Sequence, residues 1–180
     1  ALLSWLDDGQ AARAAFAGAD NMTDSLSALS SLLMIGQGQA ELAAFERRWS
    51  GDRLVMDKWF GLQIALAAPD RAAPLAEALA GHPAFTLKNP NRFRAVFGAL
   101  AGNHAGFHHA SGQGYRALAR ALIALDPLNP QTAARVSTAF ETWARYDAIR
   151  QAEARAALDS IAAQPGISRD LSEMVARMLG

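Results

Sequence analysis

The sequence predicts an all-α protein, an irregular α-solenoid in which antiparallel helical hairpins stack as an α-α superhelix. Apolar residues recur at helical spacing through nearly all of the 180 residues, and no segment alternates apolar and polar residues for long enough to form a strand. Residues that favour helix starts alternate along the chain with glycines that favour helix ends. The connections between helical segments are short, which favours antiparallel neighbours.

Each expected helix is bounded by local signals. About eleven helices are expected, near residues 2–6, 9–18, 22–34, 39–49, 53–67, 71–80, 90–101, 112–125, 130–145, 148–163 and 169–179. The residues expected to cap helix starts are Asn21 or Thr23, Asp52, Asp70, Asn89, Ser111, Asn129, Asp147 and Ser168. The glycines expected to end helices are Gly18, Gly36, Gly38, Gly51, Gly81, Gly102 and Gly166. Because no clean repeat period is present, the array should be an irregular relative of HEAT and armadillo solenoids.

Composition favours a single helical domain, residues 1–180, that needs no cross-link. A chain of 180 residues buries roughly 70% of its unfolded surface, which is enough for a core. The absence of cysteine excludes thiol nucleophiles and weakly favours the cytoplasm, where we expect this protein. No apolar run of about 18 residues could span a membrane, and no basic segment typical of a signal peptide opens the sequence.

The N-terminus predicts a domain cut from a longer polypeptide. The sequence begins with Ala1 and enters at once an apolar segment containing Leu2, Leu3, Trp5 and Leu6. A solenoid cut between repeats exposes the apolar face that its neighbour would cover. We therefore expect self-association through the N-terminal helices.

The middle of the chain is basic although the whole chain carries no net charge. Residues 88–155 contain nine Lys or Arg against four Asp or Glu, a net charge of +5, whereas residues 1–87 carry −4 and residues 156–180 carry −1. Such a field attracts small anions and carboxylates, but it lacks the density typical of nucleic-acid binding proteins. Scattered surface charge is an equally good explanation.

Catalytic and metal-binding motifs are absent. The sequence contains no H-E-x-x-H, G-x-S-x-G, P-loop or G-x-G-x-x-G motif. His104, His108 and His109 crowd one loop, but no carboxylate between Glu77 and Asp126 completes a metal site. We therefore expect neither a metal site nor a catalytic residue in this chain. The ring N–H groups of these three histidines are expected to hold irregular backbone in place.

Two arginines occupy a well-capped helix just before this loop. Asn89 suits the N-cap and Pro90 the first helical position. Arg92 and Arg94 lie on opposite flanks of that helix, about 200° apart. Because both helix faces can pack, their guanidinium groups must reach a cavity, a rim or a partner. Arg92 is the better placed to bind loop carbonyls, a structural role.

The expected helix at 130–145 carries an organised polar stripe. Its packed face comprises Val136, Phe140 and Trp143, and its polar stripe comprises Gln131, Arg135, Thr138 and Thr142. Gln131 and Arg135 are one turn apart and can bind one ligand together. A guanidinium beside an amide suits a peptide carboxylate or a backbone carbonyl. An ordinary solvated helix face is the alternative interpretation.

Six segments carry a resemblance to a known family. They are ADNMTDSLSAL at 19–29, LVMDKWFGLQ at 54–63, FTLKNPNRFRAVFGALAGN at 85–103, FHHASGQGY at 107–115, LDPLNPQTAAR at 125–135 and RYDAIRQAEARAAL at 145–158. From about Ala19 onward, roughly nine-tenths of the chain, the sequence resembles the C-terminal helical domain of bacterial aminopeptidase N, a zinc metallopeptidase.

The resemblance implies an α-helical superhelix that caps a catalytic domain and limits the enzyme to short peptides and N-terminal residues. It also implies that Arg94, Gln131 and Arg135 reach toward the substrate channel. The family's H-E-x-x-H zinc helix and G-A-M-E-N loop have no counterpart in this sequence. The resemblance therefore implies a chain that is inactive by itself and holds no cofactor. Its expected partners are short peptides and a zinc-bearing catalytic domain of the same polypeptide. Nucleic acid and membranes are not expected as partners.

Two other classes of function remain open. An independent α-solenoid that binds proteins would explain the fold, but it should show a regular repeat and an exposed apolar groove. An autonomous helical enzyme is less favoured, because no nucleophile, base and orienting group assemble in the sequence.

Overall fold

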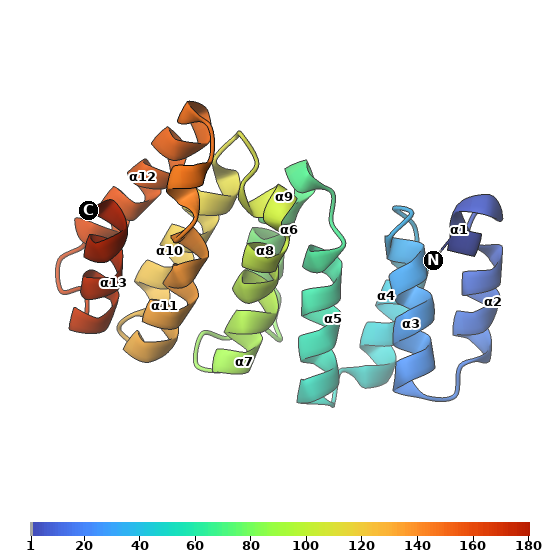
Figure 1. Cartoon of the computed structure of the whole chain (residues 1–180). Coiled ribbons are helices and arrows are strands. Elements are labelled where there is room, and N and C mark those ends of the chain that lie inside the picture. The colour runs from blue at the N-terminus through green and yellow to red at the C-terminus, as the bar shows by residue number, and fades with distance from the viewer. Residues whose placement is uncertain (1) are drawn as a thin grey trace. The chain divides into compact units, whose positions relative to one another are not determined.

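The computed structural model describes residues 2–180, and every regular element in that range is a helix (Figure 1). The predicted all-α class is therefore confirmed. The chain forms two compact units, one ending at Ala67 and the other beginning at Ala68. None of the described helices combines the length and apolar character needed to cross a bilayer.

The first unit is built from uninterrupted α-helices. They are α1 (Leu2–Leu6), α2 (Gln10–Gly18), α3 (Met22–Leu33), α4 (Gln39–Trp49) and α5 (Arg53–Ala65). Helix α2 packs along α3, and both α3 and α4 contact α5. Leu29, Phe45 and Phe60 are among the fully buried side chains of this unit's core.

The predicted helix starts of the first unit are confirmed. Asn21 Oδ1 accepts a hydrogen bond from the Asp24 N–H at 2.9 Å at the start of α3. Asp52 Oδ1 accepts one from the Leu54 N–H at 2.9 Å at the start of α5. Each bond satisfies a donor that the first helical turn leaves unpaired.

The apolar N-terminal residues are exposed, as the sequence predicts. The exposed fractions are 85% for Leu2, 57% for Leu3, 65% for Trp5 and 85% for Leu6. Self-association through these residues remains a prediction.

The second unit centres on α10. Its elements are α6 (Pro69–Ala80), α7 (Pro90–Phe93), a π turn (Arg94–Gly98), α8 (Ala99–Gly102), α9 (His104–Phe107), α10 (Gln113–Leu125), α11 (Pro130–Ser137), two 3₁₀ turns (Thr138–Phe140 and Trp143–Arg145), α12 (Ala148–Ala162) and α13 (Arg169–Leu179). Helix α10 contacts α6, α8, α9, α11 and α12. Its side chains Tyr115, Leu118 and Leu122 are completely buried, so α10 is the core helix of this unit.

The helix predicted at 90–101 is present, but its middle is a π turn instead of a regular α-helix. Asn89 caps its start as predicted, with Oδ1 accepting from the Asn91 N–H at 3.0 Å. The five residues from Arg94 to Gly98 then form a π turn, which places an extra residue in the turn. Phe93, Val96 and Leu100 on either side of it are all completely buried. Tertiary packing therefore overrides the regular helical period here.

The continuous helix predicted at 130–145 is also wrong, because α11 ends at Ser137. Ser137 Oγ donates to the Ala134 carbonyl at 2.7 Å, and Thr138 Oγ1 donates to the Arg135 carbonyl at 2.8 Å. Hydroxyl groups that bond to the preceding turn compete with the helical backbone pattern. The chain tightens into 3₁₀ turns as a result.

Two predicted cap residues are also corrected. Helix α6 begins at Pro69, whose fixed φ suits a first turn, so Asp70 lies inside that turn instead of capping it. Helix α10 begins after Gly112 instead of Ser111. Gly112 has φ 68, and a Cβ there would lie 2.1 Å from Glu153 Oε2. Only glycine fits that position without strain.

A buried carboxylate joins the end of α10 to the start of α13. Asp126, 3% exposed, accepts hydrogen bonds from the Ser168 N–H at 2.7 Å and the Ser168 hydroxyl at 2.5 Å. Ser168 Oγ also caps α13 by accepting from the Leu171 N–H at 3.2 Å. We call this the Asp126–Ser168 link.

Candidate functional site: a cationic cavity in the second unit

A cavity of about 440 Å³ lies in the second unit, beside its irregular segments. Four groups of residues line it: Arg94 and Gly98 of the π turn, Ala101 and Gly102 of α8, His104 and His108 at α9, and Arg135, Val136, Thr138, Ala139 and Thr142 across the end of α11 and the following turns. The lining combines two guanidinium groups and two imidazole rings with threonine hydroxyls. No carboxylate is among the lining residues.

The cavity brings Arg94 and Arg135 together, as the sequence predicts for two of its three candidate residues. Arg94 donates to Asn91 Oδ1 at 2.6 Å, which steadies its exposed side chain. Among the described residues, the Arg135 guanidinium has neither a hydrogen-bond acceptor nor an acidic partner. Arg135 therefore carries an uncompensated positive charge into the cavity.

Gln131, the third candidate, lies on α11 and is exposed. It is not among the residues that line the cavity, and its role stays a prediction. Thr138 and Thr142, the other members of the predicted polar stripe, do line the cavity.

Arg92 differs from Arg94 as predicted. Its side chain is 4% exposed, and its guanidinium donates to the Ala84 carbonyl in the loop before α7. Arg92 thus binds loop backbone inside the unit, whereas Arg94 lies on the cavity side of its helix.

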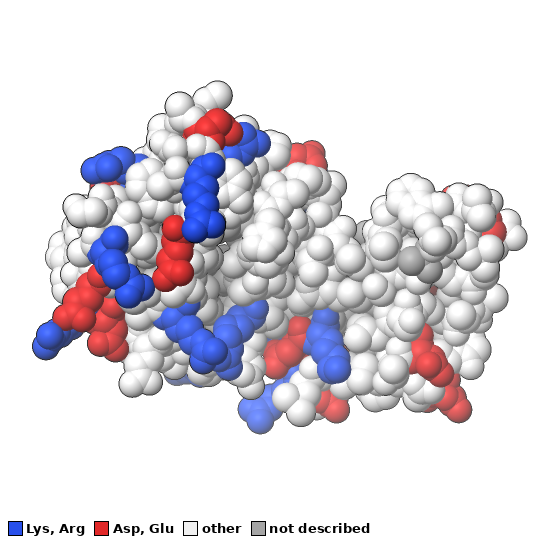
Figure 2. All heavy atoms as spheres, viewed as in Figure 1, with Lys and Arg blue, Asp and Glu red and all other residues white. Residues whose placement is uncertain are grey.

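Charges elsewhere on the second unit are largely compensated. On the face drawn in Figure 2, basic and acidic side chains intermingle, without a dense field of one sign. Arg116 pairs with Glu153, and Arg177 pairs with Glu141 at 3.2 Å. Such exposed pairs contribute little stability, and within residues 2–180 neither Arg94 nor Arg135 takes part in one.

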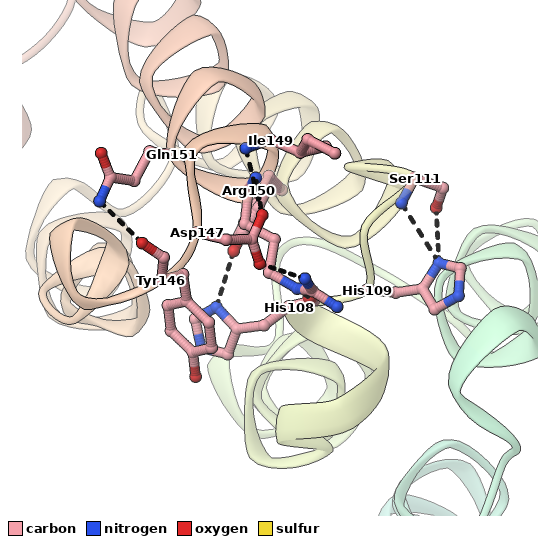
Figure 3. A network of polar contacts seen from close by, with 9 residues as sticks. His108, His109, Ser111, Tyr146, Asp147, Ile149, Arg150 and Gln151 are labelled. Atoms are coloured by element: carbon pink, nitrogen blue, oxygen red, sulfur yellow. Dashed lines mark hydrogen bonds and ion pairs between the residues drawn. The ribbon is translucent and has the colours of Figure 1, made fainter.

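A polar network behind the cavity was not predicted from the sequence (Figure 3). His108 Nδ1 lies 2.9 Å from the Tyr115 hydroxyl, and the His108 ring stacks on Tyr146 with centroids 4.1 Å apart. Arg150 Nε donates to the His108 carbonyl at 2.6 Å, and Arg150 also pairs with Asp147. The adjacent His108 and His109 and the tyrosines Tyr115 and Tyr146 are visible in the sequence. Their separation along the chain gives no sign of a network, because only the fold brings His108 and the tyrosines together.

Burial controls the protonation of this network. Burial, followed by the nearby His104 and Arg150, lowers the pKa of His108 from 6.5 to about 4. Burial also raises the pKa of Tyr115 to about 12. At neutral pH the imidazole is therefore uncharged and the phenol keeps its proton.

The prediction that the ring N–H groups of His104, His108 and His109 hold backbone is wrong in its chemistry, because His109 binds backbone as an acceptor and His108 bonds the Tyr115 side chain. His109 Nδ1 accepts from the Ser111 N–H at 3.3 Å, and His82 Nδ1 accepts from the Ala84 N–H at 3.1 Å. No group of three or more His, Asp or Glu side chains within residues 2–180 is arranged to hold a metal ion. The cavity offers two imidazoles without a carboxylate, so its donor set does not fit zinc.

Comparisons with known proteins agree with this architecture. The family model described as "Domain of unknown function (DUF3458_C) ARM repeats" matches residues 1–180 and so spans both compact units. ARM repeats are the class of α-α superhelix that the sequence predicts.

Several relatives are named aminopeptidase N. The chain is 41% identical to the protein from Haemophilus influenzae and 40% identical to that from Escherichia coli, over 89% of this chain in each case. It is 38% identical to the protein from Caulobacter vibrioides over 92% of this chain. Each match covers 19% of the relative, so the chain spans about a fifth of their length.

A solved structure has the same fold. The crystal structure of Legionella pneumophila aminopeptidase A in complex with aspartic acid matches 98% of this chain and 21% of that chain, with a TM-score of 0.89 and 30% identity. On the match to its whole length, the chain belongs to the DUF3458_C family of ARM-repeat domains, and it is homologous to a domain of aminopeptidase N.

Proposed function

We propose that this chain is a capping domain of a cytoplasmic aminopeptidase N, a zinc-dependent enzyme that removes N-terminal residues from short peptides. In this role the domain walls the active-site cavity of a catalytic domain in the same polypeptide. It supplies cationic contacts to the distal end of the bound peptide and performs no chemistry itself.

The observation that carries the proposal is the shared cavity of Arg94 and Arg135. Two arginines from separate segments line it, and the guanidinium of Arg135 has no protein partner among the described residues. A guanidinium binds a carboxylate with two parallel hydrogen bonds, and its positive charge attracts the carboxylate. A peptide substrate carries such a carboxylate at its far end. We include Gln131, one turn before Arg135 on α11, as an amide contact to the same peptide.

The experiment compares two substrate types in an aminopeptidase N polypeptide that carries this domain. We expect Arg94→Ala or Arg135→Ala to reduce transition-state binding of alanyl tripeptides by roughly 1–3 kcal/mol, the range for losing a hydrogen bond to a charged group. An alanyl chromogenic amide, which has no carboxylate, should lose much less. Both kcat and KM are measured for each substrate.

Arg155→Ala provides the matched control, because Arg155 is an exposed arginine of α12 that does not line the cavity. Equal losses for the tripeptide and the amide in Arg94→Ala and Arg135→Ala contradict the carboxylate role.

The isolated chain gives a second test. It should contain no stoichiometric zinc and release no amino acid from the chromogenic amide, because its residues do not form a zinc site. Stoichiometric zinc by elemental analysis, together with activity that chelation removes, contradicts the proposal.

A further inference from the structure

His108 lines the same cavity as Arg94 and Arg135, although its side chain is only 5% exposed. Its ring is held on several sides (Figure 3). Tyr146 stacks on it at a centroid distance of 4.1 Å, and Phe107 meets it edge to face at 4.8 Å. Arg150 holds its backbone through the His108 carbonyl. The direction of both ring nitrogens is therefore fixed by packing.

Tyr115 fixes which nitrogen of His108 carries the proton. The Tyr115 side chain is completely buried, and within residues 2–180 its hydroxyl has one polar contact, His108 Nδ1 at 2.9 Å. A buried hydroxyl hydrogen without an acceptor costs about 1–3 kcal/mol. The hydroxyl therefore donates to Nδ1, which must be unprotonated. Because the imidazole is neutral at pH 7, its proton lies on Nε2.

The Nε2–H group is the donor of the His108 ring that Tyr115 leaves free. No described residue accepts a hydrogen bond from it. Within residues 2–180 the one buried side-chain nitrogen or oxygen without a partner is Trp49 Nε1. His108 Nε2 must therefore lie at an accessible surface, and the surface that His108 lines is the cavity. The cavity thus presents an uncharged, oriented donor beside two guanidinium groups.

We propose that His108 Nε2–H binds the C-terminal carboxylate of the peptide that Arg94 and Arg135 attract, and that Tyr115 is the positioning residue that keeps this donor in place. The inference rests on the proposed function and assigns its ligand contact. The arginines supply charge, which attracts any anion. His108 supplies one directed hydrogen bond, which favours a carboxylate seated at a defined depth.

The test uses nitrogen-15 NMR of the 180-residue chain at pH 7. The ring spectrum should show His108 as the Nε2–H tautomer. Adding Ala-Ala-Ala should shift the Nε2 resonance of His108 and the Nε resonance of Arg135, whereas Ala-Ala-Ala amide should shift neither. Acetate and inorganic phosphate, added separately, distinguish a peptide site from a general anion site, and we expect both to bind at least tenfold more weakly than the tripeptide.

Two variants separate the donor from its positioning. His108→Phe keeps an aromatic ring without the donor and should weaken tripeptide binding roughly tenfold or more, the loss expected for a hydrogen bond to a charged group. Tyr115→Phe should release the tautomer, so that His108 populates Nδ1–H and binds the tripeptide more weakly. Arg155→Ala is the control and should bind normally.

The outcomes are distinguishable. A His108 Nδ1–H tautomer in the unmodified chain, or a His108 signal that stays in place while Arg135 responds, overturns this inference and leaves the proposed cationic site intact. If neither residue responds to millimolar tripeptide, the proposed peptide contact fails as well. Should His108→Phe not fold, the tautomer of the unmodified chain and the Tyr115→Phe titration decide the question.

Discussion

The two compact units differ in the regularity of their helices. The first unit, ending at Ala67, contains uninterrupted α-helices, and a cavity of about 420 Å³ in it is lined mostly by Ala and Ser. The second unit contains a π turn and two 3₁₀ turns. Those irregular segments contribute Arg94, Gly98, Thr138 and Ala139 to its cationic cavity.

The irregular turns of the second unit indicate where this fold can place polar groups. A regular helix packed on both faces has no room for a buried polar cluster, since each turn repeats the same orientation. A π turn or a 3₁₀ turn changes that orientation and releases backbone groups. In the second unit residues of such turns line the cavity.

Removing the aromatic side chain that supports the irregular region should lower the free energy of unfolding most. Phe107 is completely buried and contacts Tyr115 and Phe140 at centroid distances of 5.2 Å and 5.4 Å. Phe107→Ala should lower the free energy of unfolding by about 3–5 kcal/mol, measured by urea denaturation. Phe16→Ala, at a half-buried site of α2, should cost less. Similar decreases in the free energy of unfolding for Phe107→Ala and Phe16→Ala would contradict the prediction.

The second prediction concerns pH. The folded protein holds the pKa of His108 near 4, below its usual 6.5, so protonation favours the unfolded chain. The free energy of unfolding is therefore unaffected by protonation of His108 above pH 6.5. As the pH falls from 6.5 toward 4, it decreases by up to about 3 kcal/mol. Denaturation of the wild type and of His108→Gln at pH 7, 6, 5 and 4 measures this loss. If the two stability curves remain parallel over that range, His108 is not the responsible group.

The third prediction separates the neighbouring arginines Arg92 and Arg94. Because buried Arg92 donates to the Ala84 carbonyl, Arg92→Ala should lower the free energy of unfolding by about 1–3 kcal/mol. Arg94→Ala, at an exposed site, should change it by less than about 0.5 kcal/mol. Thermal and urea unfolding of the two variants side by side test the pair. Comparable destabilisation by both changes argues against this division of roles.

The smallest effect is expected at the N-terminal helices. Leu2, Leu3, Trp5 and Leu6 expose apolar surface, which should cause weak self-association of the isolated chain at high concentration. Replacing Leu3 and Trp5 with serine should abolish it without altering the helical content. Sedimentation velocity of the wild type and the variant over a range of concentrations measures the association, and circular dichroism measures the helical content. A strictly monomeric wild type at the highest concentration contradicts the prediction.

The sequence predicts the regular parts of the fold well because their signals are local. Asn21, Asp52, Asn129 and Asp147 each accept the expected hydrogen bond from the first turn of their helix. A cap needs only three or four adjacent residues, so its sequence pattern is sufficient.

The irregular parts could not be predicted, because distant residues determine them. The π turn at Arg94 depends on how Phe93, Val96 and Leu100 are buried, and no local pattern reports that packing. Short helix α9 did carry one usable signal, Asn103, whose Oδ1 accepts from the Gly106 N–H at 3.0 Å. Three members of the predicted polar stripe, Arg135, Thr138 and Thr142, line the cavity although the helix ends at Ser137, whereas Gln131 does not line it.

The Asp126–Ser168 link has a consequence for the order of folding. Its two residues are 42 positions apart, so it forms only after α11 and α12 have brought the chain back, and closing such a loop is entropically slow. The same Ser168 hydroxyl caps α13. The first turn of the last helix is therefore coupled to a tertiary contact, and α13 should be the last helix of the second unit to become fully protected from hydrogen exchange during refolding.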